Sequence, residues 1–147
     1  MINFIKNTLR IKIFNINFIK LLWDFKKIPI YTINNLNEIN NSNGALSYYI
    51  DIFNSYEAFD FFIRIDNNLN KKQKITTLLH ELGHYIDFTI KNGLKSKSDK
   101  ILEKKAWKEA LRLSDKYNLP LDINFSIDCL NTYNTQYKCL ENRKKYD

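Results

Sequence analysis

The two histidines of this sequence stand four residues apart, and a glutamate directly follows the first, in the run His80-Glu81-Leu82-Gly83-His84. On a helix, a four-residue step places both imidazoles on one face about one turn apart, close enough to bind a single zinc ion. Glu81 would then face the open side of the metal, where a carboxylate can accept a proton from bound water. The pattern therefore predicts a hydrolytic zinc site with Glu81 as its general base.

The residues around this run predict the helix that such a site requires. Asn70 is suited to cap its start, and Gly93 is suited to end it, so we expect a helix over residues 71–91. His80, His84 and Asp87 would form a polar stripe on this helix. Asp87 is a candidate to accept the free ring N–H of a metal-binding histidine, with an ordinary exposed helix carboxylate as the alternative. The stripe expected to be buried contains Ile75, Leu78, Leu79, Leu82, Ile86 and Ile90.

A hydrolytic zinc ion needs a third protein ligand, and the sequence has no further histidine to supply it. The candidate is Glu103, in a predicted helix over residues 98–117 that Ser98 and Asp99 would cap. Ala106 and Ala110 follow Glu103 at intervals of three and seven residues, and their small side chains would let this helix approach the histidine helix closely. Glu109 is the competing candidate by residue type, but it falls off that face.

The pattern His80-Glu-Leu-Gly-His84 followed by Glu103-x-x-Ala106-Trp107 resembles the gluzincin metallopeptidases. In a chain of this length it is most similar to the ImmA/IrrE-like minimal gluzincins of phages and mobile elements. The resemblance implies a Zn²⁺-dependent endopeptidase in which His80, His84 and Glu103 bind the metal and Glu81 is the general base. It also implies a peptide or protein substrate, with a repressor or other transcriptional regulator as a candidate.

The resemblance further implies an α+β fold in which a small, mostly antiparallel sheet packs on the active-site helix and on a second, glutamate-bearing helix. Residues 28–66 read as the sheet, with strands expected at 28–33, 45–53 and 57–65. We expect the third strand to offer the edge on which an extended substrate pairs. A last helix is expected over residues 125–141, after an extended connection over 121–125.

The richer gluzincin pattern includes a third histidine that stabilises the oxyanion of the reaction, and this sequence has none to spare. Another hydrogen-bond donor would have to serve. The sequence leaves five candidates open, which are Arg64, Tyr85, Tyr117, Tyr133 and Tyr137.

The N-terminal segment 1–27 is basic, with six Lys or Arg residues against one acid. Phe14, Phe18, Leu21, Leu22 and Phe25 fit an amphipathic helix packed against the domain, although the alternation from Phe14 to Phe18 also fits a strand. Contact with a membrane or an acidic partner is the alternative role of such a helix. The segment lacks the continuous apolar run of a signal peptide or a transmembrane helix, which predicts a cytoplasmic protein.

Composition bounds the remaining possibilities. The 147 residues, of which 44% are hydrophobic, are typical of one folded domain over residues 1–147. A net charge of +7 favours nucleic-acid binding, but the abundance of Lys, Asn and Ile indicates a codon bias, so a nucleic-acid partner is left open. Cys129 and Cys139 match no zinc spacing and are expected to be free thiols. The sequence thus predicts a zinc endopeptidase, with an inactive zinc-binding interaction module of a phage or mobile element as the alternative.

Overall fold

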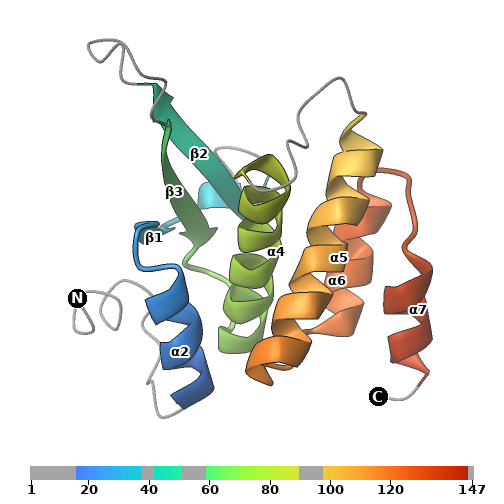
Figure 1. The fold of residues 1–147 in the computed structure, drawn as a ribbon. Coiled ribbons are helices and arrows are strands. Elements are labelled where there is room, and N and C mark those ends of the chain that lie inside the picture. Colours follow the sequence, from blue (N-terminus) through green and yellow to red (C-terminus); the bar gives the residue numbers. More distant parts are fainter. Residues whose placement is uncertain (1–15, 38–41, 51–58, 90–97, 146–147) are drawn as a thin grey trace.

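The computed structural model describes residues 16–37, 42–50, 59–89 and 98–145. A three-stranded sheet lies on one side of helix α4 (Lys71–Thr89), and helix α5 (Asp99–Tyr117) lies on the other (Figure 1). Helices α6 (Ile123–Asn131) and α7 (Lys138–Lys144) follow beyond α5, and α2 (Ile16–Asp24) packs near the sheet and α5. The fold is therefore α+β, as predicted, with α4 between the sheet on one side and α5, α6 and α7 on the other.

The sheet contains β1 (Ile30–Ile33), β2 (Gly44–Ile50) and β3 (Phe59–Asp66) in the order β1-β3-β2. β2 pairs with β3 in the antiparallel sense, whereas β1 pairs with β3 in the parallel sense. The sheet was expected to be mostly antiparallel, but it is mixed, because only β2 is antiparallel to β3 and β1 is parallel to it. Residues 54–56, which join the second and third predicted strands, lie outside the described residues.

β3 occupies the centre of the sheet, and its inward side chains lie in the hydrophobic core. Ile63 and Ile65 are completely buried, and they face the apolar stripe of α4 that the sequence predicts. In that stripe Leu78, Leu79, Leu82 and Ile86 are buried, Ile75 is partly buried, and Ile90 lies outside the described residues. Burial of these side chains fixes the rotation of α4, and with it the direction in which the opposite face points.

The start of α4 is held by reciprocal hydrogen bonds between Asn70 and Gln73. The Gln73 backbone N–H donates to Asn70 Oδ1 at 2.9 Å, and the Asn70 N–H donates to Gln73 Oε1 at 3.2 Å. This arrangement satisfies two N–H groups that a helix start otherwise leaves unpaired. The predicted cap at Asn70 is confirmed, whereas the predicted end at Gly93 lies outside the described residues.

The segment after α5 differs from the prediction. The single helix expected over residues 125–141 is wrong, because α6 ends at Asn131, α7 begins at Lys138, and Asn134 between them has a left-handed backbone with φ of 51°. The expected extended connection over 121–125 is also wrong in its second half. Asp122 caps α6 by accepting a hydrogen bond from the Phe125 N–H at 3.1 Å, so the helix begins at Ile123.

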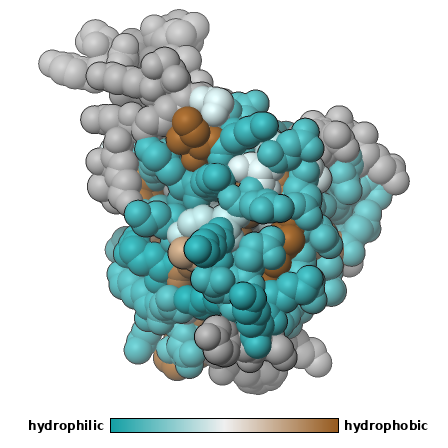
Figure 2. Space-filling model, turned by 90° about the vertical axis from the view of Figure 1, so that its right-hand side faces the viewer, coloured by the Kyte–Doolittle hydropathy of each residue, from teal (hydrophilic) through white to brown (hydrophobic). Residues whose placement is uncertain are grey.

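At the N-terminal end, the predicted amphipathic helix is present as α2, while residues 1–15 lie outside the described part. Phe18, Leu21 and Leu22 are buried in the core, so the apolar face of α2 packs against the domain. The face of the molecule that Figure 2 shows is largely hydrophilic, with small, separate apolar areas. Within the described ranges, no helix combines the length and apolar character needed to cross a membrane.

Candidate metal centre

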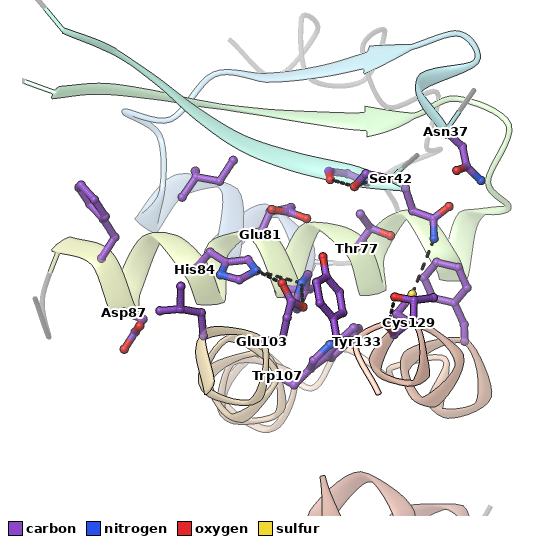
Figure 3. A pocket seen from close by; sticks show the side chains of 18 of the residues that line it. Asn37, Ser42, Thr77, Glu81, His84, Asp87, Glu103, Trp107, Cys129 and Tyr133 are labelled. Atoms are coloured by element: carbon purple, nitrogen blue, oxygen red, sulfur yellow. Dashed lines mark hydrogen bonds and ion pairs between the residues drawn. The ribbon is translucent and has the colours of Figure 1, made fainter. Parts of the chain in front are cut away.

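Helices α4 and α5 bring the side chains of His80, His84 and Glu103 together (Figure 3). His80 Nε2 lies 3.1 Å from Glu103 Oε2, and His84 Nε2 lies 3.1 Å from Glu103 Oε1. The two Nε2 atoms are 3.1 Å from each other. Glu109, the competing candidate, is buried elsewhere on α5 and pairs with Arg112 at 2.7 Å. The three residues predicted to bind the metal therefore form one cluster.

The spacing of these donor atoms fits a tetrahedral metal ion. Zinc bonds of about 2.0–2.1 Å at tetrahedral angles place neighbouring ligand atoms about 3.3 Å apart. The three separations of 3.1 Å in this cluster are close to that value. Two imidazoles and one carboxylate are also the donor set of catalytic zinc sites, which keep a fourth position open. The residues present thus fit a zinc ion.

Charge is concentrated at this cluster. Burial raises the pKa of Glu103, but hydrogen bonds and charge interactions with His80 and His84 outweigh it and hold that pKa well below its usual range. Burial likewise lowers the pKa of His84, but Glu103, Glu81 and Asp87 together raise it. The Glu103 carboxylate and the His84 imidazole therefore stabilise one another in their charged forms.

His80 is held in place by Trp107 from α5. The two rings stack with centroids 4.3 Å apart and planes 25° apart. Trp107 is buried, as is the Nδ1 atom of His80, which has no hydrogen-bond partner within the described part of the chain. A histidine that binds metal commonly donates a hydrogen bond from its second ring nitrogen, which holds the ring in place. The His80 ring has no such hydrogen bond in the described structure, so its orientation depends on stacking against Trp107.

Glu81 is buried beside the start of β2. A Cβ atom at Gly44 would lie 3.1 Å from Glu81 Oε1 and 2.4 Å from Thr77 Cγ2. A side chain at position 44 would therefore have to displace Thr77 and press on Glu81. The glycine lets the backbone of β2 pass close to the carboxylate that the sequence predicts as the general base.

A cleft of about 720 Å³ opens over the cluster, between β2 and the helices (Figure 3). His80, Glu81, His84 and Glu103 all line it. One part of the cleft has polar walls from the loop before β2 and from α6, where Asn43 Nδ2 donates to Cys129 Sγ at 3.7 Å. Its other part is more apolar, with Leu46, Phe61, Phe88 and Leu102. A volume of this size accommodates a peptide or a small molecule.

Tyr133 is the candidate oxyanion donor that lines this cleft. Burial raises its pKa to about 12, and the charges of Glu103 and Glu81 add to the shift. Two of the other candidates have their polar groups engaged elsewhere, since the Tyr117 hydroxyl donates to Asp24 and Arg64 donates to Ser47 at 3.1 Å. Tyr85 packs edge-on against Phe25 and Phe61, and Tyr137 packs against the hydrophobic core.

Asp87 lies on the predicted stripe and is buried, so it is not the exposed carboxylate considered as the alternative. The sequence made Asp87 a candidate acceptor for the ring N–H of a metal-binding histidine. For His80 this hydrogen bond is absent from the described structure, since His80 Nδ1 and Asp87 Oδ1 are each buried without a hydrogen-bond partner there. Instead, Asp87 Oδ1 lies 3.9 Å from Lys105 Nζ on α5.

The prediction that the strand before α4 offers its edge to a substrate is wrong. β3 pairs with β1 on one side and with β2 on the other, so it lies in the interior of the sheet. The strand at the edge beside the cleft is β2, whose Gly44 and Leu46 line the cavity. The sequence indicates which segments form strands, but it does not give the order of the strands in the sheet. That order depends on pairing between segments that are distant in the chain.

Several residues of the cleft were not anticipated from the sequence. Thr77 lies one turn before His80 and Glu81 on α4, so helical periodicity could have found it. Asn43 and Cys129 come from segments that are far apart in the chain, and local pattern offers no signal for them. Both cysteines are free thiols, as predicted, and burial raises the pKa of Cys129 to about 11.

Comparison of the chain with protein-family models, with curated proteins and with solved structures found no match to any of the three.

Proposed function

We propose that this protein is a zinc-dependent endopeptidase that hydrolyses a peptide bond in an extended protein segment. The observation that carries the proposal is the convergence of His80, His84 and Glu103 at 3.1 Å separations, with Glu81 beside them in an open cleft. The resemblance of the two helices to the ImmA/IrrE-like minimal gluzincins supports the same function. His80, His84 and Glu103 would hold the metal.

When bound, zinc polarises a carbonyl group and lowers the pKa of water to about 7. Glu81 accepts the proton of the attacking water and later returns it to the amine that leaves. Burial of Glu81 beside Gly44 limits the positions that its carboxylate can take. A carboxylate held in one position favours proton transfer between Glu81 and the reacting groups.

Tyr133 supplies the hydrogen bond that stabilises the oxyanion. A pKa of about 12 keeps its hydroxyl protonated at neutral pH, so the group remains a donor throughout the reaction. A donor of this kind acts on the negative charge that develops on the oxygen during the reaction. Its place on the wall of the cleft, in the segment after α6, suits this role.

The edge of β2 is the proposed binding surface for the substrate. An extended peptide that pairs with β2 would lie along the cleft, and its backbone would provide affinity with little demand on sequence. Antiparallel pairing is preferred, because it is somewhat more stable than parallel pairing for each residue. By the resemblance, the candidate substrate is a repressor or another transcriptional regulator.

The variant Glu81→Gln tests this function. It preserves the shape of the side chain and all three metal-binding residues, but a carboxamide accepts no proton at neutral pH. Wild-type and variant proteins, each loaded with one equivalent of zinc, are incubated with peptides from a digested proteome, and new termini are identified by mass spectrometry. We expect cleavage by the wild type and a loss of several orders of magnitude in the variant. Equal inactivity of both proteins would reject the peptidase and favour a zinc-binding interaction module.

A further inference from the structure

The more apolar end of the cleft contains one buried carboxylate. Leu46, Phe61, Phe88 and Leu102 line this end together with Asp87. The rings of Phe61 and Phe88 meet edge to face, with centroids 5.0 Å apart. Such a wall would suit the aliphatic stem of a long side chain, and Asp87 adds a single negative charge to it.

The Asp87 carboxylate is under-satisfied. Its side chain is 5% exposed, and its Oδ1 atom accepts no hydrogen bond from any residue that the structure describes. A buried carboxylate oxygen without a donor is costly, because burial removes the water that would otherwise solvate it. Asp87 therefore brings to the wall of the cleft a carboxylate that lacks a hydrogen-bond donor at one of its oxygens.

Lys105 is the cation nearest to this oxygen among the ion pairs of the described residues, and it does not fill that role. Its Nζ atom lies 3.9 Å from Asp87 Oδ1, beyond the range of a hydrogen bond, and its side chain is 37% exposed. Lys105 thus partly screens Asp87 and competes with an incoming cation.

The position of Asp87 relates it to the scissile bond of the proposed reaction. Asp87 lies three residues beyond His84, which is about 4.5 Å along the helix axis. An extended peptide advances about 3.3 Å for each residue, so Asp87 is within one or two residues of the metal. Figure 3 shows Asp87 and Thr77 on opposite sides of His84 and Glu81 along α4.

The direction of β2 sets which end of the peptide reaches Asp87. The strand begins at Gly44, beside Thr77 and Glu81, and runs towards the C-terminal end of α4 (Figure 3). A peptide antiparallel to β2 runs the opposite way, so it passes Asp87 before it reaches the metal. The residues of the peptide near Asp87 are then those on the N-terminal side of the scissile bond.

We infer that Asp87 is a specificity residue, which selects an arginine or lysine one or two positions before the scissile bond of an extended substrate. The inference rests on the proposed function for the location of that bond, but the recognition of a basic side chain is a binding event. The stem of the basic residue packs on Phe88 and Leu102, and its cationic group pairs with the Asp87 carboxylate.

The test uses binding, so that its result does not depend on turnover. A degenerate decapeptide library is passed over immobilised, zinc-loaded Glu81→Gln protein, and the retained peptides are sequenced. We expect arginine and lysine to be enriched about tenfold or more at one position relative to the input. Adding Asp87→Asn should abolish this enrichment, whereas adding Lys105→Met should increase it, because the competing cation is gone.

Asp115→Asn is the matched control, since it removes the same charge from an exposed side chain on the same helix bundle, where Asp115 pairs with Arg143. It should preserve the enrichment. Zinc content is measured for every variant. The inference would be overturned if the Glu81→Gln protein showed no enrichment of basic residues. It would also be overturned if the enrichment survived Asp87→Asn, whether or not that variant kept its zinc.

The two proposals fail separately. Cleavage of peptides without any basic preference would leave the peptidase intact and reject the role of Asp87. Basic enrichment that depends on Asp87, in a protein whose wild type cleaves nothing, would reject the peptidase and retain the recognition of a basic side chain.

Discussion

A Cβ atom built on Gly83 would lie 2.2 Å from the carbonyl oxygen of Ala106. The backbones of α4 and α5 therefore touch at this point, which a residue with a side chain would prevent. Gly83 directly precedes His84, and Ala106 follows Glu103 by one turn. The same close contact that joins the two helices thus sets the distance between the histidines and the glutamate.

Replacing Gly83 with alanine should destabilise the protein. Alanine favours an isolated helix by about 1 kcal/mol relative to glycine, but overpacking against a backbone carbonyl typically costs about 1–3 kcal/mol or more. We expect a lower free energy of unfolding in urea and weaker zinc binding, because the methyl group must push Glu103 away from the histidines. A Gly83→Ala protein that is more stable than wild type and binds zinc equally well would show that the helices separate freely.

Replacing Glu103 with alanine should remove most of the zinc. Loss of one of three protein ligands weakens a metal site by orders of magnitude, and the small side chain leaves the helix intact. Glu109→Ala is the comparison, because Glu109 is buried on the same helix but pairs with Arg112. Metal analysis of the purified proteins should find about one zinc per chain in wild type and in Glu109→Ala. One equivalent retained by Glu103→Ala would move the third ligand elsewhere.

Replacing Tyr133 with phenylalanine should slow the proposed hydrolysis without changing zinc content. Removing one oxyanion donor costs about 10²–10³ in kcat in well-studied enzymes, while ground-state binding is largely preserved. The measurement is kcat and KM on one cleaved peptide, with Tyr137→Phe as the matched control. An equal loss in both variants, or a change confined to KM, would argue against Tyr133 as the oxyanion donor.

Tyr117 should make the protein less stable at alkaline pH. Burial and the hydrogen bond that its hydroxyl donates to Asp24 raise its pKa from 10.0 to about 12. Because the folded-state pKa is the higher one, this contribution to stability is complete below pH 10 and is lost as pH rises towards 12.

The test compares urea unfolding of wild type and Tyr117→Phe across that range. Near neutral pH the variant should be less stable by about 0.5–1.5 kcal/mol, the usual net value of one hydrogen bond. Between pH 10 and 12 the two proteins should converge. A constant difference throughout would mean that the hydroxyl titrates equally in the folded and unfolded states.

Local periodicity explains what could be predicted. The spacing of His80 and His84, the apolar stripe beneath them and the cap at Asn70 all lie within one helix, where neighbouring residues determine which side chains share a face. Glu103 could be named for the same reason, because the alanines that follow it mark the face of α5 that packs most closely.

Relations between distant segments could not be obtained in this way. The order of the strands, which places β2 beside the cleft and β3 in the interior, depends on pairing across the chain. The break between α6 and α7 puts Tyr133 on the wall of the cleft, whereas the continuous helix expected from apolar periodicity would have included that residue.

The sequence by itself determined the chemical types that meet at the site and the two helices that carry them, because helical periodicity is a local property. Only the tertiary structure decided which tyrosine reaches the cleft, which strand edge borders it and that Asp87 is buried without a hydrogen bond at Oδ1 in the described structure. Those features arise from packing between segments that are remote in the chain, and the burial of a polar atom is defined by all of the elements around it.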